Sequence, residues 1–132
     1  MAFTLNQLGQ VSLTVDDIEV AERFYGEVLG LRKLFRFGDL VFFDCAGVRL
    51  YLQKSTTTPF APVSSALYFR TPDISIAVQQ LKSRGVSFID TPHLIAPMED
   101  HDLWMVFFKD PAGNTLALMH EAPKGFVPQA VT

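Results

Sequence analysis

The chain repeats itself, and this internal repeat restricts the possible fold more than any other feature of the sequence. Two segments, at 10–31 and 66–86, begin with alternating apolar residues, pass through an Asp into a helical apolar pattern, and end near a Gly. Asp17 and Asp73 are 56 residues apart, and Gly30 and Gly85 are 55 apart. Self-similarity at a fixed spacing indicates copies of one supersecondary unit. The 132 residues therefore predict one domain built from two modules.

Composition limits the kind of protein that these modules form. Hydrophobic residues make up 48% of the chain and charged residues only 19%, which predicts a substantial core and excludes general disorder. The formal net charge of −3 provides no basic field for nucleic acid or an anionic membrane. The N-terminus lacks the cationic start and apolar core of a signal peptide, and no stretch is apolar for the length of a membrane span. We expect a cytoplasmic protein.

Each module is predicted to run strand, helix, strand, strand, strand. Alternation over 11–15 is typical of a half-buried strand, and Asp17 and Asp73 are placed as helix N-caps. Gly30 and Gly85 stand where a left-handed residue ends a helix. Turn residues at 45–47 and 110–114 lie between apolar runs, which predicts two hairpins. The fold class is α+β, with two tandem βαβββ modules.

The boundaries of these modules follow from the repeat. Module one is expected over 8–54, a Pro-bearing polar linker over 55–63, and module two over 64–121, all within a single domain spanning 1–122. The second copy is about ten residues longer, and the excess falls around 90–102. Residues 123–132 show no periodicity and are predicted to form an arm or to fray.

Two motifs carry a family resemblance that covers residues 8–121. The first contains Val15-Asp16-Asp17, then Phe24-Tyr25 and Leu29-Gly30; the second is Phe107-Phe108-Lys109-Asp110-Pro111-Ala112-Gly113-Asn114. Together, and in repeat, they resemble the vicinal oxygen chelate superfamily of glyoxalases, bleomycin-resistance proteins and extradiol dioxygenases. The resemblance implies that the modules curl into an incomplete barrel around a pocket and that the protein is a homodimer. The pocket forms within one chain or across two in such proteins.

The resemblance also implies where a metal ion would be held. In metal-using members each module supplies one ligand, mostly His or Glu, from its first strand and one from its last. The matching positions here are Gln10, Tyr51, Ala66 and Ala117. A methyl group coordinates nothing and a neutral phenol is a poor donor, so we expect the usual metal site to be lost and no cofactor to be needed. A divalent metal held by relocated ligands is the alternative.

Strand alternation then predicts which side chains line the pocket. If the four positions above face inward, their neighbours two residues away do so too. Arg49 is equally compatible with an exposed hairpin position, and Trp104 with an ordinary core position. The predicted ligand-binding residues are Gln10, Ser12, Arg49, Tyr51, Tyr68, Trp104 and Thr115.

The acidic segment Glu99-Asp100-His101-Asp102 lies within the extra residues of module two and is predicted to form a lid over the pocket. It is either a solvated loop, a site where His101 acts as general acid or base, or part of a relocated metal centre. His120, beside Glu121, is predicted to be a surface residue. Cys45 has no partner for a disulfide and no nearby His that would activate a thiol nucleophile.

Three functions stay open at this point. The leading hypothesis is a metal-independent protein that binds a small organic molecule, planar or bearing a carboxylate. The alternative is a glyoxalase-like lyase or isomerase, or a dioxygenase-like enzyme, in which relocated ligands or His101 perform the chemistry. The third is an interaction module with a filled cavity. The scaffold hosts many chemistries, so the resemblance alone does not choose among them.

Overall fold

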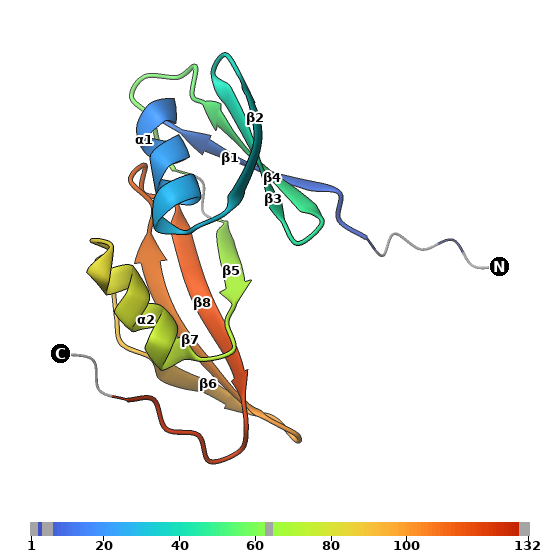
Figure 1. The fold of residues 1–132 in the computed structure, drawn as a ribbon, viewed down its shortest axis with the longest axis vertical. Coiled ribbons are helices and arrows are strands. Elements are labelled where there is room, and N and C mark those ends of the chain that lie inside the picture. Colours follow the sequence, from blue (N-terminus) through green and yellow to red (C-terminus); the bar gives the residue numbers. More distant parts are fainter. Residues whose placement is uncertain (1–2, 4–6, 63–64, 130–132) are drawn as a thin grey trace. The chain divides into compact units, whose positions relative to one another are not determined.

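The computed structural model describes residue 3 and residues 7–62 and 65–129. The chain divides into two compact units, Met1–Pro62 and Val63–Thr132. Residue 63 of the predicted linker, residue 64 of the predicted second module and residues 130–132 of the predicted tail lie outside the described residues. Each unit is a four-stranded sheet with a helix packed against it (Figure 1). No helix among the described residues has the length and apolar character needed to cross a membrane.

Unit 1 has the predicted order of elements. It consists of β1 (Gln10–Val15), α1 (Ile18–Arg23), a π-helical turn (Phe24–Val28), β2 (Arg32–Phe37), β3 (Leu40–Cys45) and β4 (Val48–Lys54). The strands are arranged β1-β4-β3-β2, with β1 parallel to β4 and the other pairs antiparallel. The sheet is not closed, since β1 and β2 remain as its edges.

Unit 2 repeats this order. It contains β5 (Ala66–Arg70), α2 (Ile74–Ser83), β6 (His93–Pro97), β7 (Asp102–Lys109) and β8 (Thr115–Ala122), arranged β5-β8-β7-β6. The registers confirm the repeat at the level of single residues. Gln10 lies opposite Arg49 in unit 1, and Ala66 lies opposite Thr115 in unit 2. The paired residues of unit 2 are thus the counterparts of those of unit 1 in the sequence repeat. The predicted α+β fold with two βαβββ modules is confirmed.

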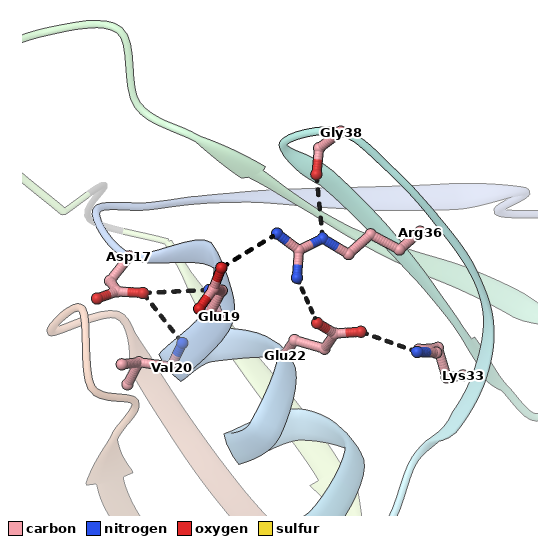
Figure 2. A network of polar contacts seen from close by, with 7 residues as sticks. All are labelled: Asp17, Glu19, Val20, Glu22, Lys33, Arg36 and Gly38. Carbon is pink, nitrogen blue, oxygen red and sulfur yellow. Dashed lines mark hydrogen bonds and ion pairs between the residues drawn. The ribbon is translucent and has the colours of Figure 1, made fainter.

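The helices begin where their caps were predicted. Asp17 Oδ1 accepts hydrogen bonds from the backbone N–H groups of Glu19 and Val20, both at 3.1 Å (Figure 2). Asp73 Oδ1 does the same for Ser75 and Ile76. Helix α2 ends in a Schellman arrangement: Gly85, at φ +90°, donates to the Lys82 carbonyl, and Val86 donates to the Leu81 carbonyl.

The end of the first helix differs from the prediction. Periodicity favoured an α-helix up to Leu29, but the last turn is π-helical and Leu29 donates its N–H to the carbonyl of Phe24. Gly26 lies in this turn directly over the buried Phe43, where an added Cβ would be 3.3 Å from the ring. A side chain at position 26 would therefore require the Phe43 ring to shift by a few tenths of an ångström.

One face of each sheet forms the core against its helix. In unit 1 alternate residues of β1, β3 and β4 are buried, and Tyr25 of the helix joins them. In unit 2 the corresponding residues of β7 and β8 pack with α2. We call the opposite face of each sheet, which no helix of that unit covers, its open face. The core side chains of unit 1 are Leu13, Val15, Val41, Phe43, Leu50 and Leu52; those of the unit 2 strands are Val106, Phe108, Leu116 and Leu118.

Residues Asp110–Asn114, which end the second motif of the family resemblance, form the β7–β8 turn and stabilise it. Asn114 is fully buried and donates from its backbone N to Asp110 Oδ1 at 2.8 Å and from Nδ2 to Oδ2 at 3.0 Å. Asp44 and Asp110 each stand three residues before a turn Gly, which matches the two residues by sequence, but the registers show that Lys109 takes the place of Asp44 in the repeat. The second turn is therefore one residue longer than the first.

The predicted lid is the turn of a hairpin. Within the segment 90–102, residues 93–97 form β6 and Asp102 begins β7, and the Met98 N–H donates to the His101 carbonyl across the tight turn. The described part of the C-terminal arm packs on unit 2. Lys124 Nζ and the Gly125 N–H both donate to the Asp102 carboxylate, and the Gln129 N–H donates to Ser75 Oγ.

We expect loss of the first helix cap to destabilise unit 1. Asp17→Ala removes the acceptor for two N–H groups at the start of α1, which typically costs about 1 kcal/mol in the free energy of unfolding. The midpoint of urea unfolding, followed by circular dichroism, should fall accordingly. Asp16→Ala is the matched control, because no hydrogen bond joins the Asp16 side chain to the helix; equal effects of the two substitutions would contradict this role of Asp17.

Candidate functional site

Three aromatic rings lie in a row on the open face of unit 1. The ring centroids of Phe35 and Phe42 are 4.5 Å apart, and those of Phe42 and Tyr51 are 5.0 Å apart, with interplanar angles of 25° and 12°. We call these three residues the aromatic ladder. The guanidinium carbon of Arg49 lies 5.9 Å from the centre of the Phe42 ring. Cross-strand pairing explains the row, because Phe35 lies opposite Phe42 and Phe42 opposite Tyr51.

Polar groups continue this face beyond Tyr51. The Tyr51 hydroxyl donates to Gln53 Oε1 at 2.9 Å, and Gln53 Nε2 donates to Thr14 Oγ1 at 3.4 Å. Gln10 and Ser12 alternate with the core residues of β1 and are exposed on the same face. The structure thus brings four predicted site residues to one face: Gln10, Ser12, Arg49 and Tyr51. The sequence missed the rest of the ladder, although alternation of Phe35, Phe37, Leu40 and Phe42 around the β2–β3 turn was a visible signal.

The open face of unit 2 carries two further predicted residues, Tyr68 and Thr115. The Tyr68 side chain is 50% exposed and meets the Phe107 ring edge-on at 6.1 Å. Thr115 Oγ1 accepts a hydrogen bond from Lys109 Nζ at 3.2 Å. The methyl groups of Ala66 and Ala117 lie among these side chains by register. This face is less aromatic than that of unit 1.

His101 lies between two carboxylates at the edge of this second face. Its Nδ1 is 2.7 Å from Asp100 Oδ1, and its Nε2 is 3.6 Å from Glu121 Oε2. Glu121 also accepts a hydrogen bond at 2.8 Å from Arg70 Nε. The hydrogen bond with His101 holds the pKa of the Asp100 carboxyl below its ordinary value. Each ring nitrogen of His101 thus has a carboxylate beside it.

Trp104 and His120 lie on the other face of the same sheet. They are opposite each other in the β7–β8 pair, and the Phe126 ring of the C-terminal arm packs edge-on against both. Trp104 is therefore placed with the core, the second of its two sequence interpretations, and away from the open face. The prediction of a surface position for His120 is wrong: it is only 4% exposed, and its Nδ1 accepts a hydrogen bond from the Ile74 N–H at the start of α2.

Other ionisable groups have structural partners. The hydrogen bond from Lys124 lowers the pKa of Asp102, so the carboxylate keeps hold of the arm to more acidic pH than an isolated Asp would. Desolvation raises the pKa of the half-buried Cys45 thiol, which disfavours the thiolate that a nucleophile requires.

The donor set does not fit the metal site that the resemblance implies. Tyr51 donates its hydroxyl hydrogen to Gln53, and Ala66 and Ala117 present only methyl groups, so three of the four matching positions offer no ligand. Gln10 alone remains. Within residues 7–62 and 65–129 there is also no group of three or more His, Cys, Asp or Glu side chains arranged to hold an ion.

Comparison with known proteins establishes the family. The family model described as the Glyoxalase/Bleomycin resistance protein/Dioxygenase superfamily matches residues 7–118. The chain therefore belongs to this superfamily, and the family resemblance of its two βαβββ modules is confirmed.

Solved structures share the fold at low sequence identity. A lactoylglutathione lyase from Agrobacterium tumefaciens is 22% identical, with a TM-score of 0.72 over 94% of this chain and 100% of that chain. An integron cassette protein from V. cholerae is 22% identical, with a TM-score of 0.74 over 92% of this chain and 100% of that one. A virulence protein from Salmonella typhimurium is 23% identical, with a TM-score of 0.75 over 91% and 100%. These similarities concern the fold.

The metal misfit generates a direct prediction. Titration of the metal-free protein with Zn²⁺, Ni²⁺ or Mn²⁺ in a calorimeter should give no binding of micromolar affinity, because one amide oxygen holds a divalent ion weakly. Gln10→Ala should leave the titration unchanged. Micromolar binding that Gln10→Ala abolishes would show that Gln10, at a position matching a metal ligand of the family, still holds a metal.

Proposed function

We propose that this protein binds a small planar organic molecule on the open face of unit 1, against the aromatic ladder, without a metal ion. The observation that carries the proposal is the row of nearly parallel rings with a cation and a hydrogen-bonding network beside it. Flat rings favour a flat partner, since offset stacking gains contact over the whole ring area. Phe35, which is 48% exposed, ends the row with an accessible ring.

Polar groups at the ladder favour a ligand with one anionic substituent. Arg49 forms no ion pair with any carboxylate in the described part of the chain, and its guanidinium lies beside the Phe42 ring. A guanidinium binds a carboxylate through two parallel hydrogen bonds, so it selects planar acids. The amide of Gln53 lies on the same face and offers a further hydrogen bond to a polar edge of the same molecule. Homodimerisation and a cytoplasmic location stay predictions.

A pair of matched probes tests the binding proposal. We expect 2-naphthoate to bind, and Phe35→Ala to weaken it by about tenfold, because loss of one stacked ring removes about 1 kcal/mol or more of contact. Arg49→Gln should weaken 2-naphthoate but leave its uncharged analogue 2-naphthol unaffected. Fluorescence titration of both probes supplies the affinities.

Ile76→Ala is the control for this series, since Ile76 is an exposed apolar residue on the outside of α2 in unit 2. Its affinities should equal those of the unchanged protein. Failure of both probes to bind below millimolar concentration, or equal weakening by Ile76→Ala, would contradict a binding site at the ladder.

The second candidate function is a glyoxalase-like lyase or isomerase, and the contact of His101 with Glu121 favours it. A histidine held between carboxylates is suited to move a proton on a bound substrate with neighbouring oxygens. The test is turnover of the hemithioacetal of methylglyoxal and glutathione. If the protein is such an enzyme, His101→Ala should lower kcat by about a hundredfold or more, as loss of a general acid or base does.

His93→Ala is the matched control for that experiment. His93 stacks on Phe107, on the same sheet, but its nearest carboxylate is Asp90 at 3.7 Å, in the segment that precedes β6. Activity that survives in His101→Ala at its original rate would remove His101 from any mechanism.

A further inference from the structure

Strand β2 is an edge strand with no buried residue. All six of its side chains are exposed, in contrast to every other strand of unit 1. It nevertheless supplies Phe35, the outer ring of the aromatic ladder. An edge strand that buries no side chain is held by its backbone hydrogen bonds to one neighbouring strand and by the contacts of its exposed side chains. The contacts between β2 and α1 therefore act together with the pairing of Phe35 and Phe42 to fix where Phe35 lies.

Those contacts are ionic. Glu22 of α1 accepts from Lys33 Nζ at 3.0 Å through Oε2 and from Arg36 Nη1 at 2.7 Å through Oε1 (Figure 2). Arg36 Nε also donates to the Gly38 carbonyl, which fixes the guanidinium at the β2–β3 turn. We call Glu22, Lys33 and Arg36 the Glu22 clamp. Its carboxylate is only 20% exposed, and the hydrogen bond from Lys33 is the largest cause that lowers its pKa.

A β-bulge makes this clamp possible. Lys33 lies opposite Phe43 and Phe35 opposite Phe42, so Leu34 is an extra residue in β2. In a regular strand, residues three apart point to opposite faces. The bulge turns Lys33 and Arg36 to the helix side together, and it turns Phe35 to the open face beside Phe42. The position of the bulge thus sets both the ionic contact and the ladder.

The second unit shows that the fold does not require charge at this place. Counted from the two caps, Glu22 corresponds to Val78, which is 2% exposed. Phe108 of unit 2 corresponds to Phe43 of unit 1. Phe43 pairs with Lys33, whereas Phe108 forms an isolated β-bridge with Phe88. Val78 and Phe88 line one cavity of about 320 Å³ between α2 and the 88–92 segment, whereas the Glu22 clamp lies in a cleft of about 520 Å³. At these matching positions unit 2 therefore has two apolar residues that face a shared cavity, and unit 1 has an ion pair.

From this contrast we infer that Glu22 is a positioning residue for the ligand face: by binding Lys33 and Arg36 at once, it fixes the bulge of β2 and so holds Phe35 in the aromatic ladder. The inference rests on the proposed function for its effect on binding. A slip of β2 by one residue would reverse its faces and direct Phe35 away from Phe42. Because the clamp is ionic and partly exposed, salt weakens it, whereas apolar burial such as that of Val78 is not screened.

Hydrogen exchange of the β2 amides, measured by mass spectrometry on the full chain, tests the inference without any ligand. Glu22→Gln should speed exchange over residues 32–37 by about tenfold, since it removes one acceptor and the negative charge that strengthens the other hydrogen bond, while β4 remains protected. In the unchanged protein, exchange over 32–37 should rise with NaCl concentration; in Glu22→Gln it should not. Glu27→Gln, in the same helix but with no cation partner among the described residues, is the control.

A rescue variant separates positioning from a general loss of stability. Glu22→Val combined with Lys33→Phe places in unit 1 the apolar residues found at the matching positions of unit 2, and it should restore slow exchange over 32–37 and remove the dependence on NaCl. Unchanged exchange in Glu22→Gln, or failure of the double variant to restore protection, would overturn the inference.

Binding of 2-naphthoate links the clamp to function. Glu22→Gln should weaken the probe by about tenfold, and the rescue variant should recover the original affinity. If 2-naphthoate fails to bind the unchanged protein, the proposed function is wrong, and the exchange data still decide the role of Glu22. If the probe binds equally to Glu22→Gln while exchange is faster, Glu22 does not position the ligand face.

Discussion

The parallel pairing of the first and last strands in each module is the constraint on which the rest of the structure depends. Parallel neighbours need a long crossover connection, and here a helix and two further strands provide it. The pairing brings Gln10 beside Arg49 and Ala66 beside Thr115, residues that are far apart in the sequence. Each candidate site residue on β1, β4, β5 or β8 owes its neighbours to this register.

One helix per sheet has a direct chemical consequence. The helix covers one face and forms the core there. The side chains on the other face do not pack in this core, so their residue types are not restricted to apolar ones. In unit 1 these are aromatic rings, an arginine and hydrogen-bonding groups; in unit 2 they include Tyr68 and the methyl groups of two alanines. The same scaffold thus presents two faces of different chemistry, and family membership leaves their ligands open.

Features that are local in sequence were predictable. The caps Asp17 and Asp73, the end of α2 at Gly85 and the order of strands all follow from residue type and spacing, and the structure confirms them. The faces of Gln10, Ser12, Arg49 and Tyr51 followed from alternation along regular strands.

Features that depend on tertiary contacts were not predictable. His120 looked like a surface residue because it precedes Glu121, but the C-terminal arm and the start of α2 bury it. Segment 90–102, which was predicted to be a lid, contains strand β6 and a tight turn, since Leu94 and Ala96 pair with β7. The bulge at Leu34 has no signal in residue type, and it decides which way Phe35 and Arg36 point.

The different chemistry of Glu22 and Val78 gives the two copies opposite responses to their surroundings. Excluded salts such as sulfate strengthen apolar burial, while they screen ion pairs. One solution condition is therefore expected to strengthen the burial of Val78 in unit 2 and to weaken the Glu22 clamp in unit 1. The two units of this chain thus share one fold but are expected to respond differently to salt. The stability of one unit in a given buffer therefore does not indicate the stability of the other.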